Sequence, residues 1–128
     1  MAEQLKQQSI LIVDDEISLL NALRDKLTHE NFVTLEAKNG EEGLALALSA
    51  HPDLILLDIV MPKMDGMTML KKLREDAWGK NVKVIMLSNL SDMKNVVDAI
   101  QQESYDYLVK SDWKLEDVVT KVREKLKQ

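Results

Sequence analysis

The strongest constraint on the fold is a set of short apolar runs, each of which ends in a polar residue. The clearest run, Leu54–Leu57, leads directly into Asp58 and is followed by the turn-forming stretch Met61 to Gly66. An unalternating apolar run bounded by turn residues is typical of a strand buried on both faces, as in a parallel sheet covered by helices. The other runs, with the residues that end them, are Ile10–Val13 with Asp14-Asp15, Val82–Leu87 with Ser88, and Tyr107–Val109 with Lys110.

If these strands are parallel, their terminal polar residues meet at one edge of the sheet. Open α/β sheets bind their ligands at that edge, outside the carboxyl ends of the strands. Taken alone, Asp58 is more readily explained as a residue that starts a turn, because Asp makes local hydrogen bonds there. The repetition of the pattern instead favours one pocket that contains an acidic pair, a lone carboxylate, a hydroxyl and an ammonium group.

The segments between the runs show helical spacing of apolar residues. The first helix is expected to open at Asp14-Asp15-Glu16, with the acids at the positive end of its dipole, and to fray near His29 to Asn31. The second and third are expected at Glu41–Ala50 and Gly66–Asp76. The residues expected on buried helix faces are Leu20, Leu23 and Leu27; Leu44, Ala47 and Leu48; Met69, Leu70 and Leu73; Met93, Val96, Val97 and Ile100; and Leu115, Val118, Val119, Val122 and Leu126.

Strands that alternate with helices at these intervals predict right-handed βαβ units. The expected fold class is α/β, a flavodoxin-like, doubly wound parallel sheet of five strands with five helices. Ser9–Val13 is the first strand, and Phe32–Ala37 is more polar than the others, which suggests a strand at the sheet edge. The strand order 2-1-3-4-5 follows if the switch point lies between strands one and three, and it places Asp14, Asp15 and Asp58 together.

Length and composition limit the class of protein. The chain has 128 residues, no cysteine and a formal net charge of −5. We expect one domain over residues 1–128, with a core over about 9–127. The absence of cysteine excludes disulfides and thiolate metal sites and is compatible with a reducing compartment, so cytoplasm is the default. Interspersed charges give no basic patch for nucleic acid, and nothing near the N-terminus predicts a membrane segment.

The three carboxylates expected at the sheet edge repel one another and require a cation if all are to stay ionised. Oxygen ligands without His or Cys suit a hard divalent ion, and Mg²⁺ takes one or two carboxylates while it keeps several waters. We therefore expect Asp15 and Asp58 to bind Mg²⁺, with Asp14 acting through water. A carboxylate can also attack a phosphoryl group to form an acyl phosphate, whose developing charge Mg²⁺, Lys110 and Ser88 can stabilise.

With these residues in view, the chain resembles the receiver domain of two-component response regulators, specifically a single-domain, chemotaxis-regulator-like member. The resemblance covers nearly the whole chain, from Ile10 to Leu126. The motifs that carry it stand at the family's intervals: Asp14-Asp15, Asp58 with Met61-Pro62 and Asp65-Gly66, Ser88, and Tyr107 with Lys110.

The resemblance implies a role for each of these residues. It implies that Asp58 is the phosphoacceptor and that Ser88 and Lys110 contact the phosphoryl group. Tyr107 corresponds to the aromatic switch residue, which turns inward when Ser88 moves. The implied ligands of Mg²⁺ are Asp14, Asp15, Asp58 and the backbone carbonyl of Val60.

Some positions depart from the family pattern. Ser111 stands where a proline usually follows the lysine. We expect a trans bond before Ser111, because a cis bond before a residue other than proline costs about 3 kcal/mol.

Val60 and Leu90 lie two residues beyond Asp58 and Ser88, at positions that flank the phosphoryl group in the family. Both are apolar, so they should either shield the acyl phosphate from water or simply pack.

The leading interpretation is a signalling switch that receives its phosphoryl group from a histidine kinase or phosphotransfer protein. Such a domain is not an enzyme beyond its own phosphorylation and dephosphorylation. Output is expected through protein contacts of the face formed by the fourth helix, the last strand and the fifth helix, in a monomer or a phosphorylation-dependent dimer. The chain either acts alone or is a receiver cut from a longer regulator.

Two other functional classes stay open on the residues alone. The first is a phosphatase or phosphotransferase with an aspartyl-phosphate intermediate, although little chain remains for a substrate cap. The second is a pseudo-receiver that binds partners without phosphorylation, which the complete set of site residues argues against. Nucleotide hydrolysis is weaker still, because there is no glycine-rich phosphate loop.

Overall fold

The computed structural model describes residues 7–88, 106–109 and 114–126, which form five strands and four helices. The expected helix around Met93 to Ile100 lies outside the described residues, as do Leu90, Lys110 and Ser111. The elements are β1 (Ser9–Val13), α1 (Ile17–His29), β2 (Val33–Ala37), α2 (Gly40–Ala50), β3 (Leu54–Asp58), α3 (Gly66–Arg74), β4 (Lys83–Ser88), β5 (Asp106–Val109) and α5 (Leu115–Leu126).

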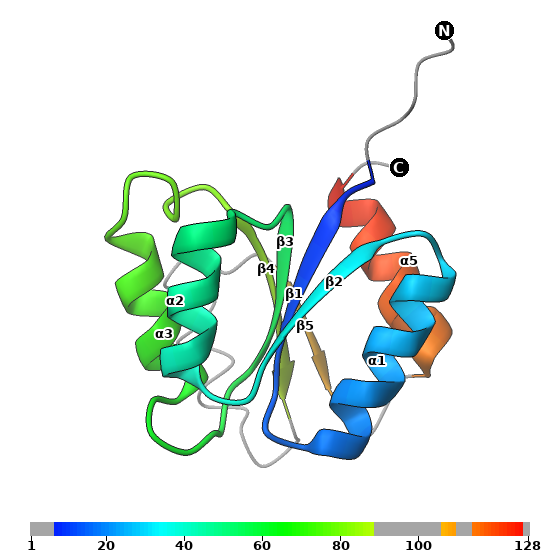
Figure 1. Ribbon diagram of the computed structural model, residues 1–128, viewed down its shortest axis with the longest axis horizontal. Helices are drawn as coiled ribbons and strands as arrows, with labels where there is room; N and C mark the ends of the chain where they lie inside the picture. The colour runs from blue at the N-terminus through cyan, green and yellow to red at the C-terminus, as the bar shows by residue number, and fades with distance from the viewer. Residues whose placement is uncertain (1–6, 89–105, 110–113, 127–128) are drawn as a thin grey trace, which may run out of the picture.

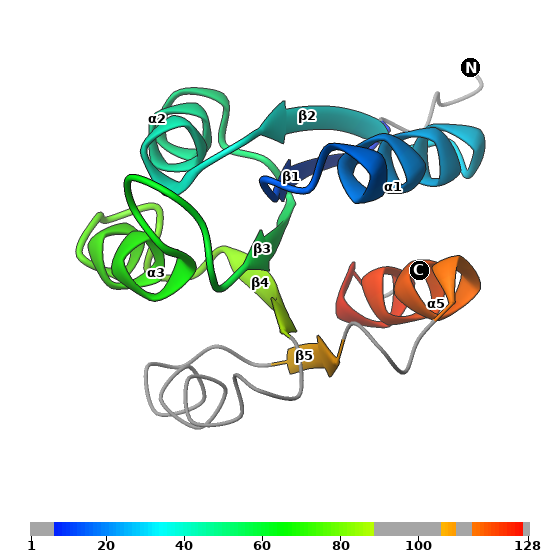
Figure 2. The same cartoon turned by 90° about the horizontal axis from the view of Figure 1, so that it is seen from below.

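The strands form one parallel sheet in the order β2-β1-β3-β4-β5. Helices α2 and α3 cover one face of the sheet, and α1 and α5 cover the other (Figures 1 and 2). This arrangement confirms the predicted doubly wound fold and places β2 at the edge. Within the described part of the chain, no helix is long and apolar enough to cross a membrane.

The apolar runs are buried because both faces of the sheet are covered. Every residue of β3 is buried, and the side chains of β1 and β3 alternate between two hydrophobic clusters. Leu11 and Ile55 pack on the side of α2 and α3, whereas Ile12 and Leu56 pack on the side of α1 and α5. The predicted stripe of α5 is also confirmed at its centre, where three valines are buried: Val118, Val119 and Val122.

Two local predictions were wrong. Helix α1 begins at Ile17, with Glu16 as an extended N-cap, so its first turn contains no acid. The Oδ1 atom of Asp14 instead accepts a hydrogen bond from the backbone N–H of Glu16 (2.9 Å), which uses that carboxylate to build the turn. In α2, Ala47 is buried, but the Leu48 side chain grouped with it is 38% exposed.

Helix α2 ends at its predicted stop, beside an aromatic contact between two connections. His51 takes a left-handed conformation (φ 50°) as the C-cap, directly before Pro52. Its ring stacks on Trp78 from the connection between α3 and β4, with the ring centroids 4.2 Å apart and an interplanar angle of 10°. The stack therefore joins the two connections.

A clasp joins the start of β1 to the residue before β3. The backbone N–H of Ser9 donates to Oδ2 of Asp53 (2.7 Å), and the backbone N–H of Asp53 donates to the carbonyl oxygen of Ser9 (2.9 Å). The clasp continues the β1–β3 pairing, in which Ile10 lies beside Leu54. It therefore reinforces the strand register at the amino end of the sheet.

Candidate functional site: an acidic cluster at the carboxyl edge of the sheet

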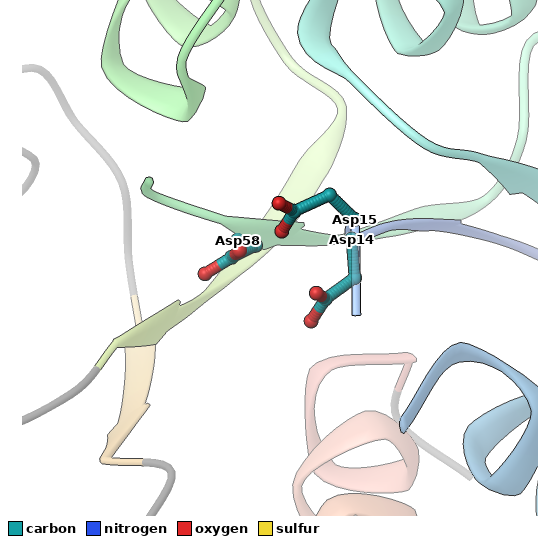
Figure 3. A group of neighbouring side chains, drawn as sticks. All are labelled: Asp14, Asp15 and Asp58. Carbon is teal, nitrogen blue, oxygen red and sulfur yellow. The ribbon is translucent and has the colours of Figure 1, made fainter. Parts of the chain in front are cut away.

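Three carboxylates meet where β1 and β3 end. Asp58 is the last residue of β3, and Asp14 and Asp15 directly follow β1. Each offers a carboxylate oxygen that lies within 4.8 Å of the other two, and Figure 3 shows the three groups close together. Asp14 and Asp58 are almost fully buried (0% and 4% exposed), whereas Asp15 is exposed. The predicted acidic cluster is thus present, with one side open to solvent.

Backbone hydrogen bonds position both strand ends. The N–H of Asp14 donates to the carbonyl oxygen of Ala37 in β2 (3.1 Å). On the other side of β3, the N–H of Ile59 donates to the carbonyl oxygen of Leu87 in β4 (3.3 Å). The neighbouring strands therefore extend their pairing past the last residues of β1 and β3, which limits the freedom of the buried carboxylates.

The loop that follows Asp58 folds back on the strand end through Gly66. The N–H of Gly66 donates to the carbonyl oxygen of Ile59 (2.8 Å), and a Cβ atom at Gly66 would overlap the carbonyl oxygen of Asp58. Only glycine therefore fits this close approach. In the sequence, Asp65-Gly66 signals a turn, but the need for glycine depends on this return to Asp58.

The same loop contains a tight turn and a helix cap. Lys63 has a positive φ of 67°, and the N–H of Met64 donates to the carbonyl oxygen of Pro62 (2.7 Å), which is the hydrogen bond of a γ-turn. Asp65 then caps α3, since its Oδ1 accepts from the N–H of Thr68 (2.8 Å). The path from Asp58 to α3 is therefore held by a backbone turn and a side-chain cap.

The remaining predicted site residues lie in the loop after β3, in β4 and β5, or directly after β5 in the sequence. The sequence left two expectations for the Val60 side chain, that it shields the acyl phosphate or that it simply packs. Val60 is 56% exposed, so its side chain does not pack in the core. Ser88 ends β4 beside Val109, and Tyr107 lies in β5. Lys110 lies outside the described residues. The structure thus brings the three aspartates together and places Ser88 at the same edge of the sheet.

The donor set fits a hard divalent cation. All three groups are carboxylates, whose hard oxygen atoms suit Mg²⁺. One oxygen atom of each lies within 4.8 Å of the other two, so the three residues could together hold one ion. Two of the carboxylates are also buried, where like charges repel most strongly without a cation.

Comparison with known proteins identifies the family. The family model for the response regulator receiver domain matches residues 10–123, which include every described strand apart from the first residue of β1, and most of α5. The chain belongs to the receiver domain family. A receiver domain is a phospho-acceptor rather than an enzyme, and its acidic cluster is typical of the Mg²⁺ site of such domains. Membership also implies a histidine kinase as the class of partner.

The chain is similar to parts of longer curated proteins. The chain is 39% identical over 108 residues to the transcriptional regulatory protein ResD of Bacillus subtilis, covering 84% of this chain and 44% of ResD. It is 34% identical over 106 residues to the probable transcriptional regulator ycf27 of Porphyridium aerugineum, covering 83% and 43%. The receiver domain thus spans less than half the length of these relatives.

Solved structures show the same fold over nearly the whole receiver domain. A CheY-like receiver domain protein from Methanospirillum hungatei superimposes with a TM-score of 0.88 at 29% identity, covering 95% of each chain. The chemotaxis response regulator CheY4 of Vibrio cholerae superimposes with a TM-score of 0.86 at 25% identity, covering 93% of this chain and 98% of that one. The similarity therefore extends to receiver domains that are solved on their own.

Proposed function

We propose that this chain is one receiver domain, spanning residues 1–128, that switches its protein contacts when Asp58 is phosphorylated. The phosphoryl group comes from a phosphohistidine on a histidine kinase or phosphotransfer protein, in a reaction that depends on Mg²⁺. The observation that carries the proposal is the burial of Asp58 beside Asp14 and Asp15. Clustering three carboxylates is unfavourable by itself, which supports a site built for a cation and a phosphoryl group.

In the proposed transfer, a carboxylate oxygen of Asp58 attacks phosphorus as the phosphorus–nitrogen bond of phosphohistidine breaks. The new bond is the phosphorus–oxygen bond of an acyl phosphate, and the electron pair of the broken bond returns to the imidazole. When bound, Mg²⁺ neutralises charge on the phosphoryl oxygens. The residues proposed to hold it are Asp14, Asp15, Asp58 and, through its carbonyl oxygen, Val60.

The proposed switch uses the strands on the far side of β3. Ser88 and Lys110 contact the phosphoryl group, and Tyr107 responds to the movement of Ser88. Both Ser88 and Tyr107 border the face made by β5, α5 and the helix expected between β4 and β5, so this face is the proposed output surface. Its partner is a protein, and the domain acts in the cytoplasm as a monomer or a phosphorylation-dependent dimer.

The test is incubation with acetyl phosphate and Mg²⁺, followed by intact-mass and peptide mass spectrometry. The parent should gain one phosphoryl group on the peptide that contains Asp58, and Asp58→Asn should gain none. Asp15→Ala should lose the dependence on Mg²⁺. Asp25→Asn is the matched control, because it removes a carboxylate that is 73% exposed on α1, and it should label like the parent.

Two results would overturn the proposal. Undiminished labelling of Asp58→Asn would show that another residue is the acceptor. A parent that binds Mg²⁺ but cannot be labelled by any phosphoryl donor would instead be a pseudo-receiver, which binds partners without phosphorylation.

A further inference from the structure

The first peptide N–H of α2 holds the loop that follows Asp58. The backbone N–H of Gly40 donates to the carbonyl oxygen of Met64 (2.9 Å). A Cβ atom at Gly40 would overlap that oxygen and would lie 2.9 Å from both the carbonyl carbon and the Cβ of Met64. The approach is thus close enough to require glycine, and it joins α2 to a segment that is distant in the sequence.

This hydrogen bond uses a donor that the helix itself cannot satisfy. The first N–H groups of an α-helix have no acceptor within the helix. The third helical N–H, of Glu42, donates to Oδ1 of the N-cap Asn39 (2.9 Å), and the Glu42 carboxylate accepts from the N–H of Lys38 (3.0 Å). Asn39 is only 6% exposed. The start of α2 is thereby fixed in place, and the N–H of Gly40 is directed at the loop.

The hydrogen bond to Met64 restrains the middle of a loop that is fixed at both ends. Ile59 is bound to Leu87 on one side and to the N–H of Gly66 on the other. Met61 is buried in the hydrophobic cluster under α2 and α3. Between Ile59 and Met61 lies Val60, whose carbonyl oxygen is a proposed ligand of Mg²⁺. Any displacement of Met64 is passed along this short, tightly turned segment toward Val60.

We infer that Gly40 is a positioning residue for the phosphorylation site: it holds the loop from Ile59 to Gly66 in the conformation that presents the Val60 carbonyl to the cation. This inference rests on the proposed function. It gives α2, which contributes no ligand, a defined part in building the site. Coupling between two sites is reciprocal, so Mg²⁺ binding should in turn strengthen the hydrogen bond between Gly40 and Met64.

The experiment compares Gly40→Ala with Gly79→Ala. Gly79 is a matched control, because a Cβ atom there would overlap the carbonyl oxygen of Leu73, the same kind of backbone clash. Gly79 lies in the connection that leads into the amino end of β4, whereas the acidic cluster lies at the carboxyl ends of β1 and β3. Both variants should lose thermal stability. Amide hydrogen exchange is measured on the metal-free folded proteins at low temperature, and Mg²⁺ affinity is measured by titration of backbone amide NMR signals.

In the metal-free Gly40→Ala protein, the backbone amides of residues 59–66 should exchange their hydrogens faster than in the parent. In Gly79→Ala these amides should exchange at the parental rate. Because one backbone hydrogen bond is lost next to a ligand, Gly40→Ala should bind Mg²⁺ about tenfold more weakly. Gly79→Ala should bind Mg²⁺ like the parent. Mg²⁺ should slow exchange of the Gly40 amide in the parent but not in Asp15→Ala.

A second variant keeps the test decisive if Gly40→Ala does not fold. Asn39→Ala adds no clash and removes the cap of α2, and it should shift loop exchange and Mg²⁺ affinity in the same direction by a smaller factor. Parental Mg²⁺ affinity in the folded Gly40 or Asn39 variant would refute the inference alone. A parent that binds no Mg²⁺ at the acidic cluster would refute the proposed function and, with it, this inference.

Discussion

Replacing Asp58 by asparagine should stabilise the metal-free protein, because it removes charge repulsion inside the acidic cluster. The carboxylate oxygens lie within 4.8 Å of one another; at that limit, two unit charges repel by about 0.9 kcal/mol at the dielectric constant of water and by about 3.5 kcal/mol at an effective value of 20. The higher repulsion energy applies better to Asp58 and Asp14, because both are buried. The lower energy applies better to Asp58 and Asp15, because Asp15 is exposed.

Asparagine keeps the shape and part of the polarity of Asp58, so we expect a net gain between these two figures, about 2 kcal/mol. For a domain of this size, that gain raises the melting temperature by roughly 6 to 8 °C. Mg²⁺ at a hundred times its dissociation constant should stabilise the parent by about 2.7 kcal/mol. In Asp58→Asn this stabilisation should be largely lost, since a ligand is missing.

The assay is thermal unfolding followed by circular dichroism, in a chelator and in excess Mg²⁺. Glu75→Gln is the control for net charge, because Glu75 is an exposed carboxylate at the end of α3, outside the cluster. It should leave the response to Mg²⁺ unchanged. A lower melting temperature of Asp58→Asn in chelator, or an undiminished response to Mg²⁺, would show that repulsion does not govern the site.

Three further predictions test other parts of the molecule. Val60→Asn should speed loss of the phosphoryl group from Asp58, because an exposed polar side chain there can orient the attacking water, and a decay rate at or below the parental rate would contradict this. The hydrogen bond from Arg123 (2.7 Å) lowers the pKa of Glu30 below its ordinary 4.5. The stability that ionised Glu30 contributes is therefore complete above about pH 4.5 and is lost as the pH falls through the lowered pKa. Arg123→Met should flatten this part of the acid-unfolding curve, and an unchanged slope would refute the assignment. Leu73→Ala should reduce the free energy of unfolding by about 2–5 kcal/mol and Leu48→Ala by less than about 1 kcal/mol, because of the two only Leu73 is buried. Urea denaturation measures both losses, and equal losses would contradict the difference in burial.

The sheet and its acidic edge could be predicted because burial on both faces leaves a simple pattern in the sequence. Apolar runs, interrupted only by Lys83 in the run for β4, marked β1, β3 and β4 to within a residue, and parallel pairing then required their ends to meet. Leu48 was misassigned because helical periodicity identifies a face without showing how wide its buried part is. Helix α2 turns only a narrow stripe toward the sheet, where Gly43 and Ala47 are buried.

Other features depend on contacts between segments distant in the sequence. Asn39-Gly40 signals a turn, yet Asn39 is a helix cap and Gly40 binds the loop after Asp58. The acids before α1 matched the charge preference of a helix start, but they precede the helix, and the carboxylate of Asp14 builds the turn that leads into it. In both cases the local signal was correct, and the missing information was the partner that the fold supplies.

The clasp between Ser9 and Asp53 links the assembly of the sheet to the assembly of the site. Both residues stand five positions before a buried carboxylate of the cluster, Asp14 and Asp58, and both pairs have the same sequence offset of 44. The clasp lies about 16 Å from the acidic cluster, the length of five strand residues. A slip of β3 by one residue would break the clasp and turn every β3 side chain to the opposite face of the sheet. A mispaired sheet could not gather the three carboxylates and would lack the cation site. Binding of a cation would therefore also report on strand register, because only correctly paired molecules could bind the ion and be stabilised by it.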